Sequence, residues 1–431
     1  MANGQTQVFL NDKAYLRCKS DIGDELRSFR SCLRWMCIDQ SNPWRASLSW
    51  SIFFLLTIFV PILSHFGLSC IDCDAQLHRP YDAVLQLSLS SLATVSFLSL
   101  STFLQKYGLK RFLHFDNLCK DSEEVRRGYT AQLDRSLKLL ALVVLPCFVA
   151  EAAYKIWWYN SGGSQIPFLG NIYISDAIAC ILQLCSWLYR TTIFFLVCVL
   201  FRLICSLQIL RLQVFAKVFE EASDVESVLK EHLRIRKHLR VISHRFRTFI
   251  LSSLVIITAS QLASLLNTTK AHAVVSIYRS GELALCSLTL MAGVFILLRS
   301  ATKITHKAQS VTCLAAKWHI CATLDSFDDT NAETPTDQIA SCGHLFPITE
   351  ESEEEDAGDE DDEIDTTKII ISAYAHSISF QKRQALVTYF ENNRAGITVF
   401  GFMLDRTSLH TMFMIELSLV LWFLGKTVGI S

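Results

Sequence analysis

Hydrophobic residues in this chain fall into seven long runs separated by polar segments. A helix needs roughly 20 mostly apolar residues to cross a bilayer core of about 30 Å, because only helices and closed barrels satisfy their backbone groups in lipid. The residue-by-residue alternation of a barrel strand is absent. The pattern therefore predicts an all-α polytopic membrane protein with spans at approximately residues 46–66, 83–104, 136–154, 176–203, 248–266, 281–298 and 408–425.

Basic residues alternate between the segments that join these runs. Four segments hold seven, seven, nine and nine Lys or Arg residues, and the segments between them hold only one or two. Cytoplasmic segments carry the excess of Lys and Arg. The alternation predicts a cytoplasmic N-terminus and an extracellular C-terminus, which is opposite to the orientation of a G-protein-coupled receptor. The basic-rich segments are residues 1–45, 105–135, 204–247 and 299–407.

Long helices are expected to continue some spans into the cytoplasm. Residues 204–249 contain no Pro or Gly and show helical apolar spacing, so they should form two helices that extend spans four and five. Their basic residues favour anionic lipid head groups over nucleic acid, because no nucleic-acid-binding module accompanies them. A similar helical pattern leads into the last run, within the C-terminal part 368–431.

An acidic insert interrupts the last cytoplasmic segment. It separates residues 46–324, which hold the first six spans and their helical extensions, from the C-terminal part 368–431. Twelve of the sixteen residues in 350–365 are Asp or Glu, a density that cannot bury a core. We expect residues 325–367 to be a disordered, solvated linker. The alternative is an acidic tract that docks on the basic inner helices.

Composition gives no sign of an enzyme. Hydrophobic residues make up 51% of the chain and charged residues 19%, below the roughly 25% of a soluble domain. No hydrolase, nucleotide-binding, kinase or metalloprotease motif is present, and no metal site or cofactor is expected. On outer loops, Asn267 begins a glycosylation sequon, and Cys70 and Cys73 form either a local disulfide or two unpaired thiols.

Polar residues inside the runs are the candidate functional groups, because burying them in lipid is unfavourable. Arg190 and Glu416 form either a structural ion pair or interhelical hydrogen bonds, or else they contact a pore or a ligand. In the outer halves of the third and fourth runs, a few residues lie deeper than the interfacial aromatic belt and are candidates for an outward-facing ligand pocket. They are Phe148, Glu151, Gln183 and Trp187.

The C-terminal sequence resembles a known family. The runs from Phe380 to Tyr389, from Gly396 to Arg406 and from Glu416 to Thr427 look like a plant family of membrane proteins with a domain of unknown function, which is distantly similar to insect gustatory and odorant receptors. The resemblance implies a tetrameric ligand-gated cation channel. Its seventh span would line a central pore, its cytoplasmic helices would form the interface, and a small molecule would bind between the outer halves of the spans.

The same resemblance supplies candidate pore residues. They are Glu416, Ser418, Leu421, Gly425 and Lys426. Ser418-Leu419 and Gly425-Lys426 replace the Thr-Tyr and Gln-Phe pairs of the insect signature. Rings of Glu favour cations and rings of Lys favour anions, so Glu416 and Lys426 would act in opposite directions if both faced a pore.

Two other functions remain open. One is a non-conducting membrane receptor or scaffold that recruits partners through its cytoplasmic helices and insert. The other is a small-solute transporter, which the missing internal repeat disfavours. The expected partners are the lipid bilayer, further copies of the chain and an unidentified small molecule. We expect the plasma membrane as its location, with an endomembrane as the alternative.

Overall fold

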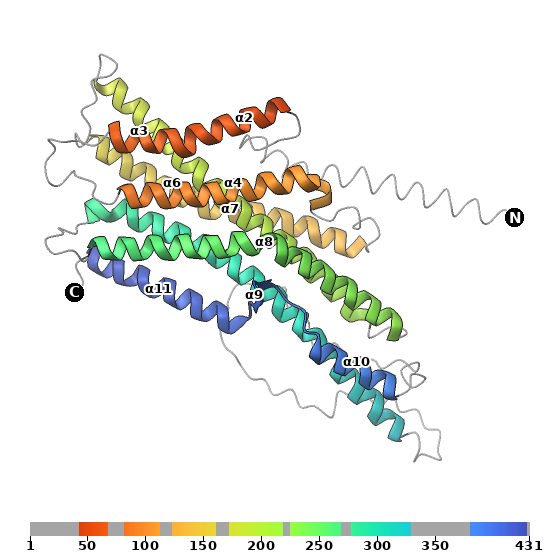
Figure 1. The fold of residues 1–431 in the computed structure, drawn as a ribbon. Helices are drawn as coiled ribbons and strands as arrows, with labels where there is room; N and C mark the ends of the chain where they lie inside the picture. The colour runs from red at the N-terminus through yellow and green to blue at the C-terminus, as the bar shows by residue number, and fades with distance from the viewer. Residues whose placement is uncertain are drawn as a thin grey trace. The chain divides into compact units, whose positions relative to one another are not determined.

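The computed structural model describes residues 43–67, 82–112, 123–160, 172–218, 225–268, 277–328 and 380–428. Almost all of these residues are helical (Figure 1). The elements are α2 (Pro43–Phe54), η1 (Leu55–Phe59), α3 (Val60–Gly67), α4 (Asp82–Phe112), α6 (Glu123–Asn160), α7 (Ile172–Val218), α8 (Val225–Thr268), α9 (Ile277–Asp328), α10 (Phe380–Asn392), β1 (Thr398–Val399), β2 (Phe402–Met403) and α11 (Arg406–Val428).

Six helices within the described ranges are long enough and apolar enough to cross a membrane. They lie at residues 43–66, 82–103, 131–160, 173–216, 225–266 and 281–320. Each contains most or all of one predicted span, so the first six predicted spans are confirmed as helices. The seventh predicted span lies on α11, which is not among the six.

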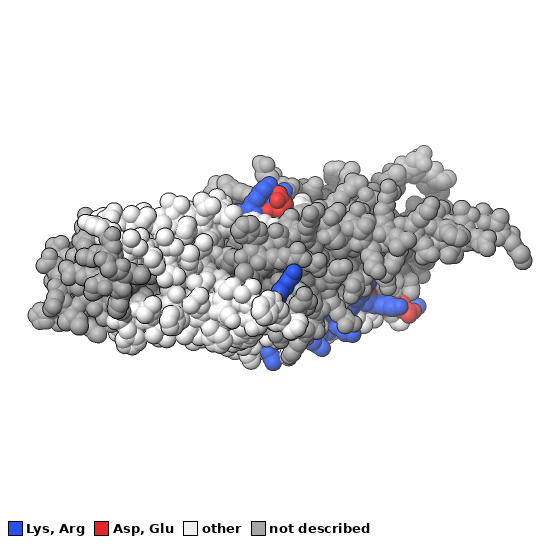
Figure 2. Space-filling model, turned by 90° about the horizontal axis from the view of Figure 1, so that it is seen from above, with Lys and Arg blue, Asp and Glu red and all other residues white. Residues whose placement is uncertain are grey.

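Exposed apolar side chains line the outside of these helices. Leu142 is 72% exposed and Leu145 is 62% exposed, and more than half of the surface of Phe59 and of Val255 is exposed. Much of the described surface seen in Figure 2 is white, and the Lys and Arg side chains gather on another part of that face. An apolar surface of this extent suits a protein surrounded by lipid.

The chain folds as two compact units, and the first contains residues 1–204, 246–300 and 406–431. Helix α7 forms much of its interior, because side chains on every side of the stretch from Ile193 to Leu200 are almost fully buried. A helix that is hydrophobic all round is expected in such a central position. Stacked rings of Phe53 and Phe97, 4.2 Å apart, join the first helix to α4.

The first spanning helix changes from α to π geometry at η1. Pro61 follows this segment, and a proline has no N–H to donate to the carbonyl four residues earlier, which here belongs to Thr57. Other helices supply the missing donors. The Ser90 hydroxyl of α4 donates to the Thr57 carbonyl at 2.9 Å, and the Ser186 hydroxyl of α7 donates to the Leu56 carbonyl at 2.6 Å.

The second unit contains residues 205–245 and 301–405. It includes the predicted helical continuations, since α7 runs to Val218 and α8 begins at Val225. Helix α10 packs on α8 through His232, whose ring centroid lies 4.4 Å from that of Phe390. Arg236 donates to the Asn393 side-chain oxygen at 2.7 Å just beyond the end of α10. Burial lowers the pKa of the Arg383 guanidinium on α10.

A tight β-hairpin between α10 and α11 was not predicted from the sequence. Strand β1 pairs antiparallel with β2. Phe400 has a φ of 49° and Gly401 a φ of 94°, the positive values that a two-residue hairpin turn requires. The Thr398 amide donates to the Ser243 hydroxyl and the Ile397 amide to the Thr305 hydroxyl, both at 3.1 Å.

The expected acidic insert lies largely outside the described residues. Helix α9 continues to Asp328, so the first four residues of the expected insert, 325–328, are helical. The expected helix before the last span is described as α10, which begins at Phe380. Residues 329–379, including the acidic tract, are not among those that the structure describes.

Candidate functional site

A buried ion cluster joins two helices of the first unit, α6 and α9. Lys155 of α6 is 1% exposed, and its ammonium nitrogen lies 2.7 Å from Glu282 Oε1 of α9. The same nitrogen lies 3.3 Å from Glu151 Oε1, one turn earlier on α6. Glu151 is fully buried and Glu282 is 6% exposed. One ammonium therefore lies between two carboxylates with almost no access to solvent.

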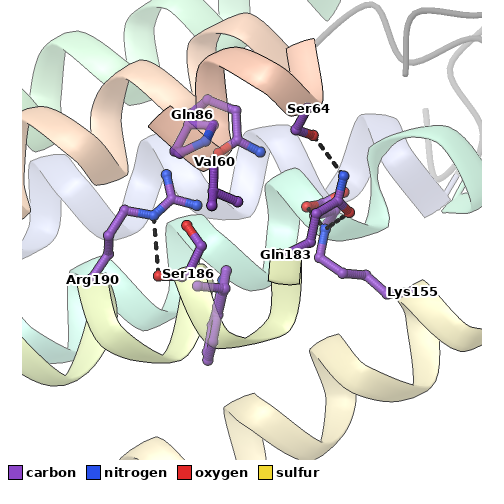
Figure 3. A pocket seen from close by; sticks show the side chains of 10 residues that line it. Val60, Ser64, Gln86, Lys155, Gln183, Ser186 and Arg190 are labelled. Carbon is purple, nitrogen blue, oxygen red and sulfur yellow. Dashed lines mark hydrogen bonds and ion pairs between the residues drawn. The ribbon is translucent and has the colours of Figure 1, made fainter. Parts of the chain in front are cut away.

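A chain of polar side chains continues from this cluster. Lys155 donates to the side-chain oxygen of Gln183 at 3.3 Å, and the Gln183 amide donates to the Ser64 hydroxyl at 2.6 Å. Figure 3 shows Gln183 between Lys155 and Ser64, with the dashed contacts on either side of it. These contacts connect α6, α7 and α3 in one hydrogen-bonded network.

Arg190 lies two turns further along α7 and bonds only to neutral groups among the described residues. Its Nε donates to the Ser186 carbonyl at 3.3 Å, and its Nη1 donates to the Ser90 hydroxyl at 3.2 Å. The side chain is 3% exposed. Described carboxylates all lie more than 4.0 Å from it. The interhelical hydrogen bonding expected for Arg190 is present, whereas its pairing with a carboxylate stays a prediction.

These groups border one narrow cavity within the first unit. Only about 10 Å³ is open to the centre of a water molecule, which is room for a single water. Most of the predicted ligand pocket is here, since Gln183 and Trp187 line the cavity and Glu151 contacts Lys155 at its edge. The lining residues are Val60, Pro61, Ser64, Gln86, Lys155, Gln183, Ser186, Trp187, Arg190 and Glu282.

Phe148, the remaining pocket candidate, lies beside the cavity. Its ring centroid is 6.3 Å from that of Trp187, and it does not line the open space. The indole Nε1 of Trp187 is buried and makes no hydrogen bond to a described residue.

Sequence reasoning missed Lys155 and Glu282. Lys155 was assigned to a loop after the third span, which is wrong because α6 continues to Asn160. The spacing of Glu151 and Lys155, four residues apart on a helix, was the signal that could have placed them on one face. Glu282 stood at the end of a predicted span, where an acidic residue is ordinarily solvated.

Helix α11 has one face packed inside the unit and one face open. Glu416 is 5% exposed and accepts a hydrogen bond from the Thr258 hydroxyl of α8. Phe413 contacts Phe295 of α9, with ring centroids 4.9 Å apart. Leu421 is 58% exposed, and Ser418 is also exposed. At about 100° per residue, Ser418 and Gly425 lie on nearly the opposite side of the helix from Glu416.

Some predicted sites fall outside the described side chains. Cys70 and Cys73 lie in the undescribed segment 68–81, and the side chain of Lys426 is likewise not described. Asn267 was expected on a loop but lies in the last turn of α8. Its glycosylation stays a prediction, as does the disulfide.

The sequence matches the family model described as "Protein of unknown function (DUF3537)" over residues 24–415. The chain belongs to this family. No curated protein sequence matches it. For this DUF3537 protein, the family resemblance predicted from the C-terminal motifs is confirmed.

Solved structures show which fold the DUF3537 chain adopts. The structure of the insect olfactory receptor OR5 from Machilis hrabei has a TM-score of 0.53 and 13% sequence identity, over 92% of this chain and 98% of that chain. The same receptor in complex with eugenol gives a TM-score of 0.51 and 14% identity, over 93% and 98%. The DUF3537 protein is therefore a multi-pass membrane protein with the fold of an insect olfactory receptor. The predicted distant similarity to insect odorant receptors is confirmed.

Proposed function

We propose that this chain is one subunit of a ligand-gated ion channel. The observation that carries the proposal is the fold similarity to an olfactory receptor along nearly the whole of both chains. One of those receptor structures holds eugenol, so the fold accommodates a small molecule in that protein. Four copies of this chain would surround one pore, as the resemblance to insect receptors implies.

The proposed topology has seven spans, with α11 as the last. The distribution of Lys and Arg supports a cytoplasmic N-terminus and an extracellular C-terminus. In this orientation the cavity at Lys155 and Arg190 would lie in the outer half of the protein. The cavity as it stands has room for a single water, so a small molecule would bind there only if the bordering helices α3, α4, α6, α7 and α9 moved apart.

The proposed pore surface is the open face of α11, which contains Ser418, Leu421 and Gly425. Ser418 and Leu421 are exposed on this face and Gly425 is half-buried, so neighbouring copies and a water-filled lumen have room beside it. We assign Glu416 a positioning role, because its carboxylate is directed to Thr258 within the subunit. Lys426 follows Gly425 by about 100° on the helix and would lie at the edge of the pore surface.

The first test is the oligomeric state of the purified protein in mild detergent and in lipid. A single α11 cannot enclose a lumen, so we expect a stable tetramer by mass photometry or native mass spectrometry. A protein that is monomeric in both environments would exclude a shared pore. That result would favour the non-conducting receptor or scaffold, for which no oligomer is required.

Charge substitutions at Leu421 test the pore surface directly. A Leu421→Glu channel would carry four carboxylates around the lumen and should shift the reversal potential towards cation selectivity, whereas Leu421→Lys should shift it towards anions. Leu421→Gln is the uncharged control. Equal reversal potentials for all three variants would remove the open face of α11 from the pore. Glu416→Gln should leave the reversal potential unchanged, since Glu416 faces α8.

A further inference from the structure

The described side chains around the cavity include one more acidic group than basic group. Their cations are Lys155 and Arg190, and their acidic groups are Glu151, Glu282 and Asp82, the last of which lies 3.4 Å from the exposed ring of His65. The Lys155 side chain reaches the cavity from α6 beside Gln183 (Figure 3). A surplus negative charge inside a membrane protein is unfavourable unless a cation or a proton offsets it.

Glu151 is the acidic group that has no hydrogen bond. It is fully buried, and neither of its oxygens accepts a hydrogen bond from a described residue. Its ion contact among the described residues is the 3.3 Å approach of the Lys155 ammonium to Oε1. Glu282 has the shorter contact with the same ammonium, 2.7 Å, and acts as its counter-ion. Glu151 is therefore the carboxyl group that lacks a cation of its own.

We propose that this cluster is a proton-binding site, in which Glu151 is protonated in the folded protein and donates a hydrogen bond to Glu282. Both carboxyl groups contact one ammonium and lie close enough to share a proton. Adjacent buried carboxylates do not readily ionise together. The proton supplies the hydrogen bond that Glu151 lacks and removes the surplus charge. It also needs almost no space, which suits a cavity with room for a single water.

Other titratable groups lie in the region around Glu151 on three further helices. They are Glu282 and Cys286 of α9, Arg190 of α7 and Asp82 of α4. A buried thiol is neutral, so Cys286 adds no charge. Arg190 donates its described hydrogen bonds to Ser186 and Ser90 and contacts none of the carboxylates. Neither group takes the place of a proton on Glu151.

The site would link the packing of α6, α7 and α9 to acidity. Water that enters a widened cavity would solvate the Glu151 carboxylate and allow it to release its proton. A small molecule binds here only after the helices move apart, so its binding would be coupled to proton release and weakened by acid. This coupling rests on the proposed function, whereas the proton site itself does not require the protein to conduct ions.

The test compares thermal unfolding of the detergent-purified wild-type protein and Glu151→Gln as a function of pH. An unfolded Glu releases its proton above about pH 4.3, so a proton held only by the folded protein makes stability fall as the pH rises. We expect the wild-type midpoint to fall relative to that of Glu151→Gln by about 1–2 °C per pH unit between about pH 5 and pH 7. A constant difference between the two midpoints would mean that Glu151 is ionised, which overturns the proposal.

Two further variants tie the effect to the shared proton. Glu282→Gln should also remove the pH dependence, because Glu151 then becomes the counter-ion of Lys155 and needs no proton. This variant keeps the proposal testable if Glu151→Gln does not fold, and a Glu282→Gln protein with the wild-type dependence would contradict it. Asp134→Asn is the matched control, because Asp134 precedes Lys138 by four residues on the same helix but is 65% exposed. It should keep the wild-type dependence.

Salt composition separates a bound proton from a bound metal cation. Replacing sodium chloride by N-methylglucamine chloride at constant pH should leave the midpoint unchanged. A decrease that is lost in Glu151→Gln would assign a sodium ion to the cluster and overturn the proposal.

Currents separate this inference from the proposed function. The expected pH dependence in a protein that carries no ligand-gated current would support the proton site and contradict the channel. Ligand-gated currents in a protein whose unfolding lacks this pH dependence would support the channel and contradict the proton site.

Discussion

Replacing Lys155 by Met should destabilise the protein by about 3–5 kcal/mol, because it leaves Glu151 and Glu282 buried without their shared cation. The methionine has a similar length and fills the same space, so lost packing contributes little. We expect a much lower yield of folded protein and an unfolding midpoint reduced by many degrees. Fluorescence-detected size exclusion and thermal unfolding in detergent measure both quantities.

The same helix offers a matched control. Lys138 of α6 lies 2.7 Å from Asp134, with the same four-residue spacing as Glu151 and Lys155, but their side chains are 75% and 65% exposed. Because this exposed pair lies at the end of the predicted third span, where a long basic side chain can reach the head groups, Lys138→Met should change the stability by less than about 1 kcal/mol. Equal effects of the two substitutions would show that burial does not strengthen the interaction at Lys155.

A rescue variant separates an unpaired charge from general damage. When Glu151 and Glu282 are both changed to Gln in the Lys155→Met background, no charge is left unpaired in the cluster. Replacing a whole buried ion cluster with neutral groups is often nearly neutral for stability. We therefore expect the triple variant to unfold at a higher temperature than Lys155→Met alone. A triple variant that is less stable than Lys155→Met would contradict this account.

The second large effect is expected at Gly293, where α9 closely approaches α7. A Cβ atom added here would lie 2.2 Å from Cε1 and 2.7 Å from Cζ of Phe194, far inside a normal contact. The Phe194 ring is itself 1% exposed and has few alternative positions. Overpacking of this kind typically destabilises by about 1–3 kcal/mol, so Gly293→Ala should lower the unfolding midpoint measurably.

Gly281 on the same helix is the control for Gly293. Its added Cβ would meet Tyr154 at 3.5 Å, an ordinary contact. Alanine also favours a helix over glycine by about 1 kcal/mol, so Gly281→Ala should be neutral or slightly stabilising. A Phe194→Leu change should restore part of the stability lost in Gly293→Ala. Equal unfolding midpoints for Gly281→Ala and Gly293→Ala would show that α7 and α9 are further apart than the structure places them.

The sequence predicted the helices well because the requirement to span lipid imposes a length and a composition. The first six spans and the long extensions of α7 and α8 beyond their apolar runs followed from helical spacing and from the absence of Pro and Gly. The hairpin was missed because its strands are only two residues long, too short for alternation to be visible. The end of α6 was missed because Lys155 was read as a loop residue, although buried ion pairs can extend a helix beyond its apolar run.

The candidate site was only partly predictable, because contacts between helices far apart in the sequence decide where its side chains point. Gln183 and Trp187 were identified because polar and aromatic residues deep in a span are unusual. The direction in which Glu416 points could not be predicted, since α11 is apolar on all sides and hydrophobicity favours none of its faces. That direction depends on Thr258, a residue more than a hundred positions earlier in the chain. Likewise, Arg190 meets Ser90 only because α4 and α7 pack together.

The π segment of the first span limits how that helix can move. The Leu56 and Thr57 carbonyls accept hydrogen bonds from α7 and α4 respectively, so the rotation of the helix about its own axis is fixed by two neighbours. A turn of one residue, about 100°, would direct both carbonyls away from their donors and leave them unsatisfied in a lipid environment. A rearrangement of the first unit that keeps these bonds must therefore move the first span, α4 and α7 together as a rigid body.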